Sequence, residues 1–136
     1  MVDPERDYEA SGHLRYAASL LALFVVVFVA LAWDPSYRED WLLENVLVFL
    51  LVPFLVLTYR RLPLSKISYS ALFLFLCLHE VGSHYTYAEV PYDQWFEAIL
   101  GRGLNDALGW ERNHIDRLVH FLWGVLIVYP VREIFL

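Results

Sequence analysis

The chain has 136 residues, of which 59% are hydrophobic, 17% are aromatic and only 19% are charged. A soluble domain of this length cannot bury so large an apolar share, so the composition predicts an integral membrane protein with a single domain, residues 1–136. The formal charge of −6 argues against a nucleic-acid-binding surface, which requires a basic face, and the single cysteine, Cys77, excludes an internal disulfide.

Four apolar runs predict four transmembrane helices, because a hydrocarbon core about 30 Å thick needs roughly 20 helical residues with internally paired backbone groups. The predicted spans are residues 16–33, 41–59, 67–86 and 115–134. The expected fold class is therefore an all-α integral membrane protein.

A further segment, residues 91–112, is too polar to span the membrane and too rich in Trp, Phe, Ile and Leu to be left in water. An interfacial or re-entrant helical segment between the third and fourth spans fits this composition. Gly101 and Gly103 are expected to break it into two short helices. It could cap a site as a lid, or it could simply connect two spans along the headgroups.

Basic residues predict the orientation, since cytoplasmic segments carry an excess of Lys and Arg. The turn RRLPLSK, between the second and third spans, contains three basic residues and no acid. If this turn is cytoplasmic, four spans place both termini in the cytoplasm as well. With Arg117 set apart because it lies within the fourth span, the basic residues divide into Arg6, Arg15, Arg60, Arg61, Lys66 and Arg132 inside, and Arg38, Arg102 and Arg112 outside.

Two polar clusters interrupt the apolar pattern at the same predicted outer face. The stretch LHEVGSHYTYAEVP ends the third span, and RNHIDRLVHF begins the fourth. Residues four apart share a helix face, so Glu80 and His84 can point together, as can Asp116 and His120. Two carboxylates and two imidazoles suit zinc, manganese or ferrous iron. The sequence therefore predicts a composite site for a divalent metal, with Glu80, His84, Asp116 and His120 as ligands.

An enzyme built on this site would be a hydrolase of a lipid or lipid-linked envelope substrate, with metal-bound water as the nucleophile. Glu80 and Asp116 would then act at the reaction centre, and Arg117 would hold an anionic headgroup. Other polar residues could support the ligands or contact the substrate: His79, Tyr85, Glu89, Asn113, His114 and Glu44.

A metal-free network is the alternative interpretation of the same residues. Arg117 would pair with Glu80 or Asp116, and the histidines would donate to carboxylates, which would hold two helices together. The protein would then be non-enzymatic, and its buried charges would serve helix packing, ion or proton movement, or association with a partner. Both classes of function stay open at the level of sequence.

The two polar stretches resemble a known family. LHEVGSHYTYAEVPYDQW followed by LGWERNHIDRLVHFLWG is similar to the paired signature of the YjdF-type bacterial inner-membrane proteins, a family of unknown function. The resemblance runs from about Trp41 onward and implies a multi-pass protein of the bacterial inner membrane. Family members usually continue with further apolar sequence beyond the stretch VREIFL. The residues that match the family's polar positions are His79, Glu80, His84, Tyr85, Glu89, Asn113, His114, Asp116, Arg117 and His120.

A fainter similarity, carried by IDRLVHFLWGVLI alone, is to the VanZ-like membrane proteins. This stretch is short and mostly apolar. Neither resemblance supplies an established activity.

Overall fold

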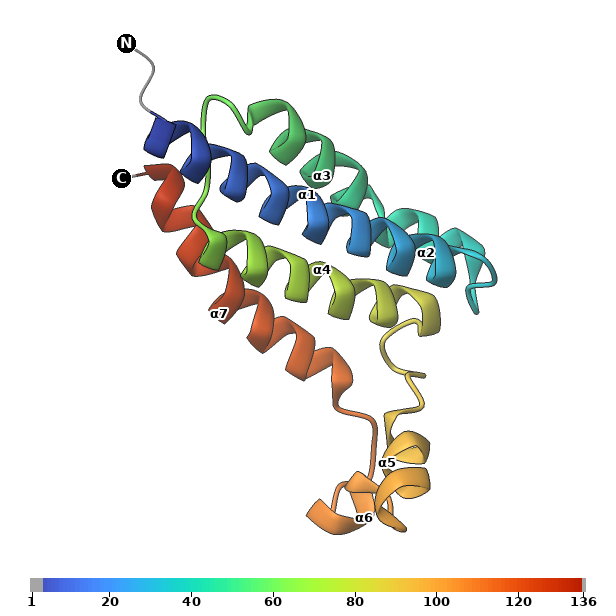
Figure 1. The fold of residues 1–136 in the computed structure, drawn as a ribbon. Helices are drawn as coiled ribbons and strands as arrows, with labels where there is room; N and C mark the ends of the chain where they lie inside the picture. Colours follow the sequence, from blue (N-terminus) through green and yellow to red (C-terminus); the bar gives the residue numbers. More distant parts are fainter. Residues whose placement is uncertain (1–3, 136) are drawn as a thin grey trace.

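The computed structural model describes residues 4–135, with side chains from residue 10 onward, and this part of the chain contains helices and no strand. The predicted all-α class is therefore confirmed. The helices in chain order are α1 (Pro4–Ala32), α2 (Arg38–Glu44), α3 (Val46–Thr58), α4 (Lys66–Tyr85), α5 (Tyr92–Leu100), α6 (Leu104–Leu108) and α7 (Ile115–Phe135). The long helices form a bundle with both chain ends at one end of it, whereas α5 and α6 project from the opposite end (Figure 1).

Three helical stretches within residues 4–135 are long and apolar enough to cross a membrane: Ala10–Ala32, Arg38–Thr58 and Ile115–Phe135. They correspond to the first, second and fourth predicted spans. The second stretch combines α2 and α3, which meet at Asn45 with φ −75° and ψ −4°. Backbone hydrogen bonds cross this junction, because the Asn45 N–H donates to Trp41 and the Phe49 N–H donates to Asn45.

The predicted third span corresponds to α4, which is not among these three stretches, so the count of four spans is confirmed only in part. The reason is composition, since this helix of 20 residues carries serine, histidine and glutamate between its apolar residues. It packs against α1 and α7 and also contacts α2. Its polar side chains therefore face protein. The buried residues along α4 are Ser68, Leu72, Phe75, Leu76, His79, Glu80, Gly82 and Ser83.

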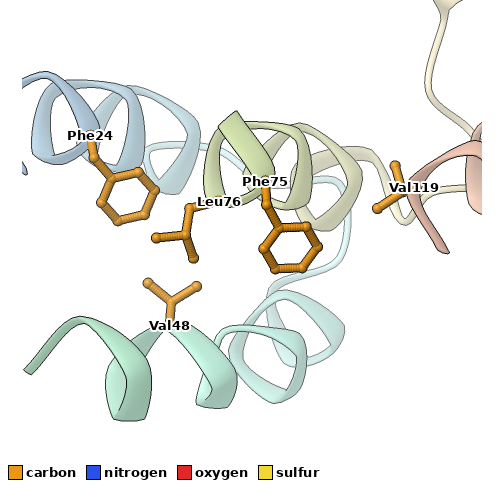
Figure 2. Packing of buried hydrophobic residues seen from close by; sticks show 5 residues of the cluster. All are labelled: Phe24, Val48, Phe75, Leu76 and Val119. Atoms are coloured by element: carbon orange, nitrogen blue, oxygen red, sulfur yellow. The ribbon is translucent and has the colours of Figure 1, made fainter. Parts of the chain in front are cut away.

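The packing of α4 is set by an apolar core cluster, made of the buried residues Phe24, Val48, Phe75, Leu76 and Val119. Figure 2 shows Leu76 between Phe24 of α1 and Val48 of α3, while Phe75 lies on the side of Val119 of α7. Adjacent helical residues point about 100° apart, so this pair contacts three neighbouring helices. The same contacts fix the rotation of α4, and with it the direction of the residues one turn later, His79 and Glu80.

At the end of the bundle where the chain ends lie, Glu133 of α7 caps the first turn of α4. Its carboxylate accepts hydrogen bonds from the Ser65 N–H at 2.9 Å and from the Ser68 hydroxyl at 2.7 Å. A negative group is favourable there because the first N–H groups of a helix lack intrahelical partners. This contact and Figure 1 show that α4 and α7 are antiparallel neighbours, which agrees with the two polar stretches lying at the same predicted membrane face.

The segment predicted to be interfacial forms a hairpin of two short helices, α5 and α6. The first ends at Gly101, which has φ 76°, and the second follows Gly103, so the predicted break at the two glycines is confirmed. Asp93 ties the pair together by accepting a hydrogen bond from the Asn105 N–H at 2.7 Å. A Cβ atom on Gly103 would come within 2.5 Å of the Asp93 carboxylate, so this close approach requires glycine.

Candidate functional site

A buried polar cluster lies where α2 and the α2–α3 junction meet the last turns of α4, at the end of the bundle away from the termini (Figure 1). Its members, called here the α2–α4 cluster, are Trp41, Glu44, Asn45, His79, Glu80, Ser83 and Tyr87. Asn45, Glu80 and Ser83 are fully buried, and His79 is 6% exposed. Polar groups removed from water are costly unless they are hydrogen-bonded, so their partners determine the chemistry of the cluster.

His79 uses both ring nitrogens. Its Nε2 lies 3.2 Å from the backbone carbonyl oxygen of Glu44 and 3.4 Å from Ser83 Oγ, and its Nδ1 lies 2.6 Å from the Tyr87 hydroxyl. Because a carbonyl oxygen only accepts, Nε2 carries a proton, and the neutral ring accepts at Nδ1 from Tyr87. The ring also stacks on Phe75, with centroids 6.0 Å apart. His79 therefore joins α4 to α2 and to the segment that follows α4.

Tyr87 reaches His79 because the chain turns back after α4. Thr86 and Tyr87 have φ values of 54° and 41°, and the Tyr87 N–H donates to the Gly82 carbonyl oxygen at 2.7 Å. The tyrosine ring then lies against Gly82, where a Cβ atom would come within 2.3 Å of it. Burial, together with the nearby charges of Glu44 and Glu80, raises the pKa of Tyr87 to about 12. Its hydroxyl therefore keeps its proton at neutral pH and can donate to His79.

Unlike His79, whose two ring nitrogens both have partners, Glu80 has a carboxylate without hydrogen-bond partners among the described residues. Both of its oxygens are buried and unpaired, as are Glu44 Oε2, Asn45 Oδ1 and Trp41 Nε1. The side-chain donors of Trp41 and Asn45 lie near its carboxylate, and Glu44 is a second acid beside it, although neither donor meets strict hydrogen-bond geometry with Glu80. The α2–α4 cluster thus holds four unpaired acceptor oxygens and one unpaired donor, the indole N–H. Among the described residues, no positive charge compensates the carboxylates of Glu80 and Glu44.

His84 was predicted to point with Glu80, but its contacts are with the end of α1. Its Nδ1 donates to the Leu31 carbonyl oxygen at 2.7 Å, and its own carbonyl oxygen accepts from the Ser36 N–H at 2.9 Å. The ring lies edge-on to Tyr85, with centroids 4.5 Å apart. His84 therefore holds the turn between α1 and α2 against α4.

The predicted residues of α7 lie in its first turns. Asp116 is half-buried and its Oδ1 has no hydrogen-bond partner in the described chain. His120 is exposed, and its Nδ1 donates to the backbone carbonyl oxygen of Asp116 at 2.7 Å. Arg117 is also exposed, and the unpaired oxygens of Glu80 show that the predicted Arg117–Glu80 pair is not formed.

The remaining predicted residues contact the connecting segments. Asn113 accepts at Oδ1 from the Ile115 N–H and donates from Nδ2 to the Val90 carbonyl oxygen, both at 2.9 Å, so it orders the start of α7. His114 packs edge-on against the Trp110 ring at 4.8 Å, and Tyr85 packs against Trp95 at 5.9 Å. Glu89 is exposed and accepts from the Tyr37 hydroxyl at 3.5 Å.

The four predicted metal ligands thus lie in three environments. Glu80 faces α2, His84 faces the end of α1, and Asp116 and His120 lie at the start of α7. In the described part of the chain, no three His, Cys, Asp or Glu side chains gather closely enough to hold a metal ion. His84 and His120 nevertheless each donate through Nδ1 to a backbone carbonyl oxygen, which leaves Nε2 free, as in histidines that ligate a metal ion.

Several members of the α2–α4 cluster were not predicted as site residues from the sequence: Trp41, Asn45, Ser83 and Tyr87. A local signal was present for one part of it, since Glu44 and Asn45 form a polar pair inside an otherwise apolar run. In a helix that faces lipid, such a pair predicts a contact with protein. Tyr87 had no such signal, because it reaches the cluster only through the turn after α4.

Comparison with known proteins gives two matches. A family model described as predicted membrane protein (DUF2238) matches residues 16–136. The chain is also 36% identical over 121 residues to the inner membrane protein YjdF of Escherichia coli (strain K12), and this match covers 89% of the chain and 53% of that protein. The chain therefore spans about half the length of the curated relative it matches. No solved structure matches the chain. The fainter resemblance to VanZ-like proteins finds no support in these matches.

Proposed function

We propose that this chain, which belongs to the DUF2238 family of predicted membrane proteins, the YjdF-type family, binds a small cation in the α2–α4 cluster. The cation is a proton or a hard metal ion such as Na⁺, Mg²⁺ or Ca²⁺. We propose further that the protein is a binding protein of the bacterial inner membrane, in which the carboxylates of the buried Glu80 and the half-buried Glu44 bind the cation without catalysing a reaction.

The observation that carries the proposal is the unpaired carboxylate of Glu80, which is fully buried. An isolated ionised carboxylate is very costly away from water, so a buried one is either neutralised or paired with a cation. Glu44 lies beside it and adds a second acid, whereas the neighbouring Trp41 and Asn45 carry no charge. A bound cation would supply the missing positive charge.

The chemistry of the unpaired atoms favours a proton or a hard ion. The free acceptors are all oxygens, from two carboxylates and one amide, and oxygen is the preferred ligand atom of hard cations. His79 does not join them, because both of its nitrogens have other partners. The donor set thus lacks the imidazole that would favour zinc. Occupancy would draw Glu44 and Asn45 toward Glu80 and tighten α2 against α4.

We further propose that α4 is a fourth membrane crossing. Its 20 residues correspond to a length of about 30 Å, the thickness of the hydrocarbon core. It runs alongside α1 and α7, both of which contain stretches able to span a membrane. With the basic turn Arg60–Lys66 in the cytoplasm, both termini are cytoplasmic and the α2–α4 cluster lies near the outer face.

This orientation is tested by labelling single cysteines in a Cys77→Ser background. A cysteine at Asp106, in α6, should react with an impermeant thiol reagent in cells with a permeabilised outer membrane. A cysteine at Ser65 should react only after the inner membrane is disrupted. The reverse pattern would place the α2–α4 cluster at the cytoplasmic face.

A second candidate function is the metal-dependent hydrolase of a lipid or lipid-linked substrate. The observation that favours it is the free Nε2 of both His84 and His120, the state in which histidine ligates metals. It requires the start of α7 to approach the Glu80 face of α4. Zinc, manganese or iron would then join Glu80, His84, Asp116 and His120, with Arg117 placed to bind an anionic group.

One set of measurements on the purified protein in detergent separates the two candidates. Isothermal titration with Na⁺, Mg²⁺ and Ca²⁺ should detect a bound hard ion that is lost in Glu80→Gln and kept in Glu89→Gln, the matched exposed control. Stoichiometric zinc, manganese or iron by elemental analysis, lost in His84→Ala, would instead favour the hydrolase. If no metal binds, the proposal requires a proton on Glu80, and stability that is independent of Glu80 at every pH would then contradict it.

A further inference from the structure

A groove with a volume of about 460 Å³ lies between α1, α3 and α4, on the side of the α2–α4 cluster toward the basic turn, and it includes none of that cluster's residues. Its walls are almost entirely aliphatic and aromatic. Its lining includes Ala17 and Ala18 of α1, Leu55 and Val56 of α3, and Leu72 of α4. Small side chains on α1 leave the space that larger ones would fill. The groove is of the size that binds a small apolar ligand.

The depth of the groove matches one leaflet of a bilayer. On α1 its lining runs from Leu14 to Phe24, and the ten helical steps between these residues rise by about 15 Å. This length is half of a hydrocarbon core about 30 Å thick. The lining on α3 and α4 comes from the halves of these helices that flank the basic turn. The groove therefore extends from the membrane surface at that end to about the midplane.

The open end of the groove carries the polar groups expected at headgroup level. Tyr59 and Tyr69 line it, their rings lie 6.1 Å apart, and Tyr59 is hydrogen-bonded to His13 at 2.9 Å. Such amphipathic aromatic residues prefer the membrane–water interface. Among the described residues, Arg60 is the one charged residue of the lining, and it is exposed. Arg61 follows it in the same turn and is exposed as well.

We propose that this groove binds one acyl chain of an anionic phospholipid, whose headgroup phosphate lies on Arg60. The apolar walls accommodate the chain over the depth of a leaflet. The tyrosine pair lies at the level of the glycerol backbone, and the guanidinium pairs with the phosphate through charge-assisted hydrogen bonds. A zwitterionic lipid offers the same chain and phosphate, but its cationic headgroup is repelled by the basic turn.

Native mass spectrometry of the purified chain with an equal mixture of phosphatidylglycerol and phosphatidylcholine tests the proposal. The wild type should retain phosphatidylglycerol in about fivefold preference, the contribution typical of one basic residue at a membrane surface. Arg60→Gln should bring the preference close to parity, whereas Arg112→Gln, at the other end of the bundle, should keep it.

The apolar part of the site is tested by filling the groove. Ala18→Phe should lose the retained lipid, and Val56→Trp should do so from the opposite wall. Ala22→Phe, which is on α1 but outside the lining, should retain lipid as the wild type does. Melting temperatures identify any variant that fails to fold. Wild-type retention in both folded groove variants, or an unchanged preference in Arg60→Gln, would overturn the proposal. So would a lipid-free dimer that Ala18→Phe converts to monomer.

Discussion

Replacing Glu80 with glutamine is expected to remove most of the pH dependence of folding stability, whereas the wild type should lose stability as the pH rises. Glutamine keeps the size of the side chain and removes the charge. At alkaline pH and without metal ions, the folded wild type must carry an ionised Glu80 with no partner. Leaving a buried charge uncompensated costs about 3–5 kcal/mol, so the variant should be the more stable protein under these conditions.

The decrease in stability with rising pH follows from a difference in proton binding by Glu80 between the folded and unfolded states. In the unfolded chain Glu80 is solvated, and it ionises as an ordinary glutamate. In the folded chain the carboxyl group is fully buried and has no cationic partner among the described residues, so its ionised form is disfavoured. The folded state then binds more protons than the unfolded state, and the free energy of unfolding falls as the pH rises. A bound metal ion would oppose this loss in proportion to its concentration.

Thermal unfolding in detergent between about pH 5 and pH 9 measures this prediction. Glu89→Gln provides the control, since Glu89 is exposed and outside the α2–α4 cluster. Its pH profile should follow that of the wild type. Parallel profiles for the wild type and Glu80→Gln would show that this carboxylate is neutralised by a partner at all times, and the cation proposal would lose its basis.

The fold was predictable from sequence to the extent that the bilayer dictates it. Runs of about 20 apolar residues must form helices in a membrane, and three of the predicted spans correspond to stretches of the structure able to cross one. The character of α4 was less accessible, because its serine, histidine and glutamate residues are covered by α1, α2 and α7. Whether neighbouring helices bury these polar residues depends on the tertiary structure, and the sequence of α4 alone does not show it.

For the candidate site too, the sequence predicted some features, whereas others depended on the tertiary structure. The polar stretch after an apolar run identified Glu80 as a predicted ligand and His79 as a supporting residue, but helical spacing could not say which neighbouring helix they would meet. That is decided by the rotation of α4, which Phe75 and Leu76 fix through the core cluster. Glu80 consequently faces Trp41 and Asn45 of the second span, where the sequence had suggested α7. The composite metal site remains a prediction, since the structure gathers its ligands only in part.

Gly82→Ala is expected to destabilise the protein by about 1–3 kcal/mol, the usual cost of forcing an extra methyl group into a filled space. The added Cβ would come within 2.3 Å of the Tyr87 ring. Gly124→Ala in α7 is the matched control, because a Cβ there meets nothing within 4 Å. That change should be neutral or stabilising by up to about 1 kcal/mol, since alanine favours helix more than glycine does.

The loss at Gly82 should arise from displacement of Tyr87, which a double-mutant cycle can establish. Tyr87→Phe keeps the ring but leaves Nδ1 of His79 without its donor, at a cost of about 1–3 kcal/mol. Tyr87→Ala removes the ring itself, so Gly82→Ala should cost little in that background and show a strong coupling between the two positions. Additive losses would mean that the glycine serves the helix backbone alone. A strong coupling would show that the close approach at Gly82 positions the hydroxyl that holds His79 in the α2–α4 cluster.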